Sequence, residues 1–301
     1  MDIAMIGLGK MGANMARRLL AGGHRVIGFD PAEAPRSALA TAGGEPVDAL
    51  ERAVEALAPP RALWIMVPAG APTDATLDRL MPRLAAGDTI VDGGNSYYRD
   101  TLRRAAAAAA RGLHYVDSGT SGGVWGLKEG YSLMIGGDPA AVERLRPIFA
   151  TLAPAPDRGW GRVGPSGAGH FTKMVHNGIE YGLMQAYAEG FSILEHKHEF
   201  ALDLHQIAEI WRHGSVVRSW LLDLTANALA DNPTLAGIAP YVEDSGEGRW
   251  TLAEAIELGV PASVIAQSLL ARLRSRDADS FSDKLLAAMR NQFGGHAIKR
   301  E

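Results

Sequence analysis

The chain has 301 residues, of which 47% are hydrophobic and 21% charged, a balance typical of a folded protein of about two domains. Its net charge of −4 gives no electrostatic reason to expect nucleic acid or an anionic membrane surface as a partner. The lack of cysteine excludes disulfides and thiolate chemistry. Residues 1–6 run directly into a glycine motif, which leaves no room for a cleavable signal, and no apolar run reaches the roughly 18 residues that a membrane span needs. We therefore expect a cytoplasmic protein that acts away from membranes, and we identify no metal site.

Short β-branched runs alternate with helical stretches through the first half of the chain. The expected strands are Ile3–Ile6, Arg25–Phe29, Ala62–Val67, Thr89–Asp92, His114–Asp117 and Ser132–Ile135. The expected helices between them are Gly12–Ala21, Ala49–Ala58, Asp74–Leu84 and Asp100–Arg111. Alternation of strands and helices predicts a doubly wound parallel sheet of the Rossmann type with right-handed crossovers.

The composition of the chain changes across residues 151–169, where prolines and glycines are frequent, and no strand is expected after them. One long helix is expected from Ala168 to about His196. Further helical stretches are expected near residues 203–213, 216–230, 251–258, 261–276 and 281–290. The sequence thus predicts a dinucleotide-binding α/β domain over residues 1–163. An all-α domain for substrate binding and dimerisation is expected over residues 164–301.

A glycine-rich turn follows the first expected strand and opens the first expected helix. Its residues are Gly7, Leu8, Gly9, Lys10, Met11 and Gly12. Glycines at this spacing permit a tight turn and let backbone amides approach a pyrophosphate at a helix N-terminus. The second strand ends at Asp30, whose carboxylate can accept both ribose hydroxyls of NAD and would repel the 2′-phosphate of NADP. We predict NAD as the preferred cofactor, with NADP possible but weaker because Arg36 is close in sequence. The alternative is that Asp30-Pro31 is merely a turn.

In an open parallel sheet the ligand lies beyond the carboxyl ends of the strands. Three such ends carry small or polar residues here, although glycine-rich strand ends are also ordinary turns. They are Val67-Pro68-Ala69, the stretch Asp92–Ser96 that contains Asn95, and the stretch Ser118–Gly123.

The most informative stretch is residues 167–181. Lys173, His176, Asn177 and Glu180 stand at positions i, i+3, i+4 and i+7, so they share one helical face among apolar neighbours. A solvated Lys–Glu pair would explain the two charges, but not the histidine and asparagine between them. Oxidation of an alcohol by hydride transfer needs a base, and a lysine serves if its surroundings lower its pKa. If the product is a β-keto acid, loss of carbon dioxide leaves an enediol that an acid must protonate at carbon, and Glu180 is available.

The sequence resembles 6-phosphogluconate dehydrogenase, decarboxylating, over essentially its whole length. The matching stretches are IGLGKMG at the start, VDGGNSYYRDT at 91–101, SGTSGGVWG at 118–126, GAGHFTKMVHNGIEYGLMQAYAE at 167–189, GRWT at 248–251 and RNQFGGH at 290–296. The resemblance implies oxidation and decarboxylation of 6-phosphogluconate to ribulose 5-phosphate, a step of the pentose phosphate pathway, with Lys173 as general base and Glu180 as general acid.

The resemblance also implies which residues line the substrate, a phosphorylated sugar acid. They are Asn95, Ser121, Gly122, Gly123, His176, Asn177 and Tyr181. Arg272 matches the family's phosphate-binding arginine. Arg290 and His296 match a tail pair that reaches the active site of the neighbouring subunit in the family. Without the surrounding motif, these two residues would be interpreted as part of a solvated tail.

The chain departs from the longer family members in three ways. It lacks their duplicated helical region. It carries Ser245 and Glu247 where they have lysine and threonine, which puts the contacts of those two positions in doubt. It has Asp30-Pro31 in place of the Asn-Arg that suits NADP, in agreement with the NAD preference.

Two other functions compete with this one. A related β-hydroxyacid dehydrogenase, acting on 3-hydroxyisobutyrate or tartronate semialdehyde, would share the fold and the lysine but would not need Glu180 or a phosphate-binding cluster. A non-catalytic NAD-binding regulator would give no reason to keep Lys173 and Glu180 on one face. A single long apolar-faced helix in a small helical domain also favours a homodimer or homotetramer over a monomer.

Overall fold

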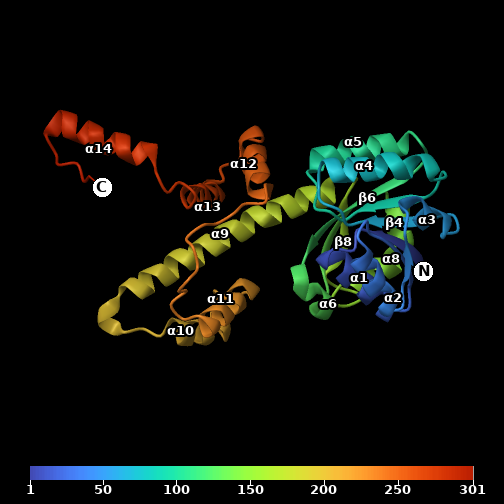
Figure 1. The fold of residues 1–301 in the computed structure, drawn as a ribbon, viewed down its shortest axis with the longest axis horizontal. Helices are drawn as coiled ribbons and strands as arrows, with labels where there is room; N and C mark the ends of the chain where they lie inside the picture. The colour runs from blue at the N-terminus through green and yellow to red at the C-terminus, as the bar shows by residue number, and fades with distance from the viewer. Residues whose placement is uncertain (301) are drawn as a thin grey trace. The chain divides into compact units, whose positions relative to one another are not determined.

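The computed structural model describes residues 1–300, apart from the side chain of Phe293. Within these residues, eight strands form one sheet in the order β3-β2-β1-β4-β5-β6-β7-β8 (Figure 1). The strands are β1 (Asp2–Ile6), β2 (Arg25–Phe29), β3 (Glu45–Val47), β4 (Ala62–Ile65), β5 (Thr89–Asp92), β6 (His114–Ser121), β7 (Ser132–Gly136) and β8 (Trp160–Gly164). Neighbouring strands are parallel except β6 and β7, which are antiparallel. The predicted class, a Rossmann-type α/β sheet followed by helices, is confirmed.

Helices cover both faces of the sheet because its central strands are apolar on both sides. The helices of this part are α1 (Lys10–Ala21), α2 (Glu33–Thr41), α3 (Leu50–Glu55), α4 (Ala71–Leu80), α5 (Tyr98–Ala109), α6 (Gly126–Glu129), α7 (Pro139–Arg144) and α8 (Arg146–Leu152). Side chains of α1 and α8, such as Met15 and Phe149, belong to one buried cluster. Those of α3, α4 and α5, such as Leu50 and Leu77, belong to the other. One helical layer with its buried cluster thus covers each face of the sheet.

Several predicted boundaries were wrong. Strand β6 continues through Ser118–Ser121, which were expected to form a loop, because these residues pair with Ser132–Ile135 of β7. Strand β8 lies inside the stretch rich in proline and glycine, where pairing with β7 outweighs the poor strand propensity of Gly161 and Gly164. Strand β3 and helices α2, α6, α7 and α8 were not expected. The helix predicted from residue 216 begins at Trp220, after the N-cap Ser219.

The chain divides into two compact units, Met1–Asn177 and a second from Gly178 onward. The expected domain boundary at residue 163 falls near the end of β8, whereas this division falls inside helix α9 (Ala168–His196). The remaining helices are α10 (Leu204–Arg212), α11 (Trp220–Asp231), α12 (Glu247–Glu257), α13 (Ser263–Arg274) and α14 (Phe281–Gly294). A small core formed by Phe191, Ala208, Leu222, Ala226 and Leu229 joins α9, α10 and α11. Among the described residues, no helix combines the length and the apolar character needed to cross a bilayer.

Candidate active site

The glycine turn between β1 and α1 is built around contacts that leave no space for side chains. Gly7 has a φ of +94°, and a Cβ there would lie 2.5 Å from the Met66 carbonyl oxygen; a Cβ on Gly12 would lie 2.0 Å from that of Gly7. At Gly9, the N-cap of α1, a Cβ would meet nothing within 4 Å, and no side chain caps the helix. The first amides of α1 therefore start beside an open position, which fits a pyrophosphate. Of the other predicted loop residues, Leu8 is buried, Lys10 is exposed, and Met11 packs against the core.

Asp30, at the end of β2, connects the glycine turn to the segment that follows β2. Its Oδ2 accepts the Leu8 N–H at 2.9 Å, and its Oδ1 accepts the Ala32 N–H at 2.9 Å. Arg36 donates to the carbonyl oxygens of Asp30 and Pro31, at 2.6 and 3.0 Å. Asp30 thus belongs to a turn, as in the alternative interpretation, while its carboxylate also stands beside the nucleotide loop. Each carboxylate oxygen can accept a further hydrogen bond from a ribose hydroxyl.

The ends of β4 and β5 adjoin this turn. Val67, Pro68 and Ala69 follow β4, and a Cβ on Gly94 would lie 2.7 Å from the Val67 carbonyl oxygen, so the two strand ends are in close contact. Asn95 has a φ of +52°. Its amide donates to the Thr120 carbonyl at 3.1 Å and accepts the Thr120 N–H at 2.8 Å, which fixes the loop after β5 to β6.

A buried polar network supports the loop that carries Asn95. The Asp92 carboxylate is fully buried and accepts hydrogen bonds from Tyr115 at 2.8 Å and Ser96 at 2.9 Å, with Arg104 at 3.4 Å. Burial, followed by the neighbouring Asp92 charge, raises the pKa of Tyr115 well above its usual 10. The phenol therefore remains a proton donor to Asp92 at physiological pH. Ser96 belongs to the stretch expected at the end of this strand, whereas Arg104 and Tyr115 were not identified from the sequence as part of the site.

Ser121, Gly122 and Gly123 stand where β6 ends. Ser121 is the last residue of β6 and pairs with Ser132. Gly122 and Gly123 have φ values of +129° and +51°, in the region that favours glycine, so the chain turns sharply here. Asn14 of α1 donates to the carbonyl of Val124 at 3.4 Å. This contact joins the loop to the helix that begins at the nucleotide turn.

Lys173, His176 and Asn177 meet on α9. The Lys173 side chain is buried, with 6% of the residue exposed. Its Nζ donates to Asn177 Oδ1 at 2.6 Å and lies 3.3 Å from His176 Nδ1, which is itself 3.2 Å from Asn177 Oδ1. A buried amine surrounded by polar groups that can reorient is suited to binding and releasing a proton. Glu180, half-buried, follows two helical turns further along α9.

Tyr181 and Arg272 form a second cluster, in the unit that begins at Gly178. The Arg272 guanidinium carbon lies 3.5 Å from the centre of the Tyr181 ring, and its Nη1 donates to the Glu243 carbonyl at 2.8 Å. The Tyr181 hydroxyl accepts the Ser245 N–H at 3.2 Å. Ser245 also donates to Glu247, so the two residues that differ from the longer family members bond to each other. This cluster offers a guanidinium, a phenol and a hydroxyl, together with one carboxylate.

A charged clamp, which sequence reasoning missed, holds the loop before α12. Asp244, whose side chain is 4% exposed, accepts two hydrogen bonds from Arg249 at 3.0 Å and one from Arg276 at 2.9 Å. The Arg249 hydrogen bonds hold the pKa of Asp244 below its usual value. The acidic pair Glu243-Asp244, followed by Arg249 five residues after Asp244, is the sequence signal that could have indicated it.

Arg290 and His296 stand at the end of the chain. Arg290 is exposed on α14, and the start of that helix is tied to α13 by an ion pair of 2.6 Å between Arg274 and Asp283. The His296 carbonyl accepts a hydrogen bond from Asn291 at 2.9 Å. These contacts are local to the end of the chain, so Arg290 keeps an exposed guanidinium.

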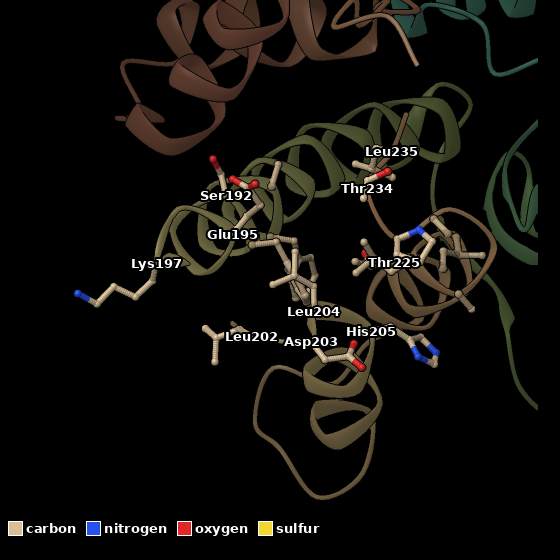
Figure 2. A pocket seen from close by; sticks show the side chains of 18 of the residues that line it. Ser192, Glu195, Lys197, Leu202, Asp203, Leu204, His205, Thr225, Thr234 and Leu235 are labelled. Carbon is tan, nitrogen blue, oxygen red and sulfur yellow. The ribbon is translucent and has the colours of Figure 1, made fainter. Parts of the chain in front are cut away.

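A large cavity of about 1180 Å³ lies elsewhere in the second unit, between α9, α10 and α11 (Figure 2). Its lining is mainly apolar, with Phe191, Leu204 and Leu224 among the residues that contribute, and it includes none of the site residues predicted from the sequence. Glu195 and Lys197 stand at its edge in Figure 2.

Comparison with known proteins agrees with a nucleotide-binding domain followed by a helical domain. The family model described as the NAD binding domain of 6-phosphogluconate dehydrogenase matches residues 2–161, and that of the 6-phosphogluconate dehydrogenase C-terminal domain matches residues 169–281. A protein of Haloferax volcanii named 6-phosphogluconate dehydrogenase, NAD(+)-dependent, decarboxylating is 44% identical over 302 residues, which cover 100% of this chain and 99% of that protein.

Solved structures share the fold. The 6-phosphogluconate dehydrogenase of Plasmodium falciparum superposes with a TM-score of 0.84 at 28% identity, covering 100% of this chain and 66% of that one. A 3-hydroxyisobutyrate dehydrogenase of Mycobacterium tuberculosis gives a TM-score of 0.73 at 24% identity, covering 92% and 94% of the two chains. The second likeness concerns the fold alone.

Proposed function

The chain belongs to the 6-phosphogluconate dehydrogenase family, and we propose that it oxidises and decarboxylates 6-phosphogluconate with NAD as hydride acceptor. The observation that carries this proposal is the buried Lys173 amine, held by Asn177 and beside His176 on a helix that continues to Glu180. A helix that buries an amine together with an amide and an imidazole is hard to explain by stability, because each polar group costs free energy to desolvate.

In the first step, Lys173 takes the proton from the substrate hydroxyl while the hydride leaves the same carbon. A base must be neutral to accept a proton, so the amine acts in its unprotonated form. The bound nicotinamide supplies the electron sink for the hydride. The amide of Asn177 and the imidazole of His176 keep the amine oriented as its charge changes.

In the second step, the β-keto acid loses carbon dioxide and leaves an enediol. Glu180 then donates a proton to carbon, which gives ribulose 5-phosphate. The helical spacing of seven residues puts this carboxyl on the same face of α9 as Lys173, so base and acid address one ligand. Proton transfer at carbon is the task that a dehydrogenase without decarboxylation does not have.

The substrate carries a phosphate at one end and a carboxylate at the other, and the remaining site residues can be assigned to these two groups. We assign the phosphate to Arg272, Arg290, His296 and Tyr181, because a guanidinium offers two parallel donors to a phosphate. We assign the carboxylate and hydroxyls to the polar groups after β5 and β6 and on α9, which are Asn95, Ser121, Gly122, Gly123, His176 and Asn177. Glu247, bonded to Ser245, adds a negative charge to the phosphate-binding cluster that a bound phosphate must tolerate.

NAD fits the residues around the glycine turn. Gly7, Gly9 and Gly12 leave the start of α1 open to a pyrophosphate, and Asp30 stands at the end of β2 for the adenosine ribose. Arg36 is engaged by the backbone carbonyls of Asp30 and Pro31. A 2′-phosphate would have to compete with these carbonyls for Arg36 and would meet the Asp30 charge, which supports the preference for NAD over NADP.

We further propose that the protein works as a homodimer or homotetramer. Large apolar side chains on α9 remain exposed, among them Ile179 at 53% and Ile193 at 72%. Exposed apolar side chains in such number are typical of association sites. Sedimentation velocity checks the proposal, and a sharp monomer peak at working concentration would contradict it.

The decisive experiment follows NADH and carbon dioxide together in purified protein given NAD and 6-phosphogluconate. Both products are expected in equal amounts. NADH without carbon dioxide would instead support a β-hydroxyacid dehydrogenase, and neither product would support a regulator. Parallel assays with 3-hydroxyisobutyrate and tartronate semialdehyde, in the direction each permits with NAD or NADH, complete the comparison.

A further inference from the structure

A carboxylate that the reaction does not use is buried beneath the start of α9. Asp117 is a central residue of β6 and has no exposed surface. Its Oδ1 accepts the Gly167 N–H at 2.7 Å, and its Oδ2 accepts the His170 N–H at 2.8 Å. A helix start leaves such amides without partners inside the helix, and a negative group there also complements the helix dipole. Both oxygens of Asp117 are thus committed to the first turn of α9.

Glycines around Asp117 let the helix come directly against the sheet. A Cβ on Gly136 would lie 2.4 Å from the Asp117 Oδ1, so the carboxylate fits only beside glycine. A Cβ on Gly169 would lie 2.6 Å from the Asp117 carbonyl oxygen, and one on Gly119 would lie 2.5 Å from the Cβ of Lys173. The helix therefore rests on β6 at the turn that carries Lys173.

We propose that Asp117 is a positioning residue, which sets the place of the Lys173 amine by fixing the first turn of α9 to β6. From Gly167 to Lys173 the helix rises about 9 Å, too short a distance to absorb a displacement at its start. In an open parallel sheet the ligand is expected where the strands end, here at β5 and β6, so a shift of α9 would move the base relative to the hydroxyl that it deprotonates. The catalytic part of this inference rests on the function proposed above, whereas the positioning of Lys173 does not.

The test is Asp117→Asn, which keeps the size of the side chain but turns an NH₂ group toward one of the two helix amides. The matched control is Asp138→Asn, because Asp138 is exposed and its Oδ1 accepts two amides at the start of α7, both at 3.0 Å. We expect Asp117→Asn to lower kcat by about 10-fold or more, as a small misplacement of a base does. We also expect a shifted pH profile of kcat, an unchanged KM for NAD, and less than a two-fold effect in the control.

A purely structural role gives a different result. It would lower the melting temperature and the fraction of active protein, but it would leave the pH profile and the turnover per active site as in the wild type. That outcome would overturn the proposal. If Asp117→Asn does not fold, Gly119→Ala pushes α9 away from the same face of β6, with Gly161→Ala in β8 as control, since a Cβ there meets nothing within 4 Å. An unchanged pH profile and kcat in folded Gly119→Ala would again overturn it.

A readout without substrate separates this inference from the proposed function. The rate at which trinitrobenzenesulfonate labels Lys173, followed by mass spectrometry as a function of pH, reports the amine itself. We expect Asp117→Asn to change that rate about five-fold or more relative to Asp138→Asn. A wild type that makes no NADH from 6-phosphogluconate refutes the proposed function but leaves this comparison valid. Equal labelling in the two variants refutes the positioning role, whatever the wild type oxidises.

Discussion

At the scale of single residues, the site depends on polar groups whose burial is unfavourable unless they have partners. Lys173 has Asn177 and His176, and Asp92 has Tyr115 and Ser96. Removing one member leaves the other desolvated, which costs about 1–3 kcal/mol for a neutral group and more for a charge. The chemistry of such a site is therefore tested best by isosteric changes, which leave the packing in place.

Glu180→Gln removes a proton donor and keeps the shape of the side chain. We expect kcat for carbon dioxide release to fall by about 100-fold, the usual contribution of a general acid, with little change in the affinity for 6-phosphogluconate. Glu189→Gln on the same helix is the control, because Glu189 is exposed and accepts a hydrogen bond from Gln185 at 2.8 Å. A large loss of affinity with unchanged turnover would contradict the acid role.

Asp30→Asn tests the cofactor preference. The change removes the negative charge beside the ribose position but retains one oxygen that can accept from Leu8 or Ala32. We expect kcat/KM for NAD to fall and that for NADP to rise, so that their ratio shifts by about 10-fold or more. Steady-state kinetics with both cofactors measure the ratio. If it does not move, the Asp30-Pro31 segment is only a turn.

At the scale of secondary structure, the sequence was most informative where apolar periodicity was regular. Strands β1, β2, β4 and β5 and the long helix α9 follow from their patterns. The second half of β6 does not, because Ser118, Gly119 and Thr120 carry no alternation and are held in the strand by antiparallel pairing with β7. Strand β8 is concealed by its glycines for the same reason.

Some residues of the candidate site could likewise be predicted from the sequence, and others could not. Lys173, His176, Asn177 and Glu180 could be grouped by helical spacing alone. Asp117 looks like the end of a predicted strand, and its role depends on where α9 begins on the sheet, which is a tertiary property. A buried carboxylate at the end of an apolar strand is the one signal that could have drawn attention to it.

The Asp244 clamp allows a prediction for the loop before α12. Asp244→Asn weakens the bonds to Arg249 and Arg276, which hold the loop that carries Ser245 against Tyr181. We expect the KM for 6-phosphogluconate to rise by about 5–10-fold, in the range of a lost charge-assisted hydrogen bond, while the KM for NAD is unchanged. Asp223→Asn is the control, since Asp223 pairs with Arg212 at a more exposed site on α11. Equal effects on both KM values would exclude a local role.

At the scale of the whole molecule, His24 makes stability depend on pH. Burial, followed by the charge of the N-terminal amine, lowers its pKa below 6.5, and its Nε2 lies 2.8 Å from the Thr151 hydroxyl. Below pH 6.5 the unfolded chain binds a proton at His24, whereas the folded chain does not bind it until the pH is lower. The contribution of His24 to the free energy of unfolding is therefore fully present above pH 6.5 and declines as the pH falls toward the folded-state pKa.

We therefore expect the melting temperature to drop more between about pH 7.5 and 5.5 in the wild type than in His24→Gln. His198→Gln, at an exposed position after α9, should behave like the wild type. Calorimetry at the two pH values measures the difference. If the wild type and His24→Gln lose the same amount, the pH dependence arises elsewhere.

Association of subunits is the remaining question at this scale, and the end of the chain offers a way to test it. If Arg290 completes the site of a neighbouring subunit, then Lys173→Ala and Arg290→Ala proteins are each inactive alone but complementary when mixed. In a mixed dimer, the chain with intact Lys173 receives intact Arg290 from its partner, so one of the two sites is complete. Random exchange makes half of the dimers mixed, which predicts recovery of about a quarter of the wild-type activity. With exchange demonstrated by mass spectrometry of differently tagged chains, no recovery would mean that Arg290 serves its own chain, because a site that draws both residues from one chain is never complete in any mixture.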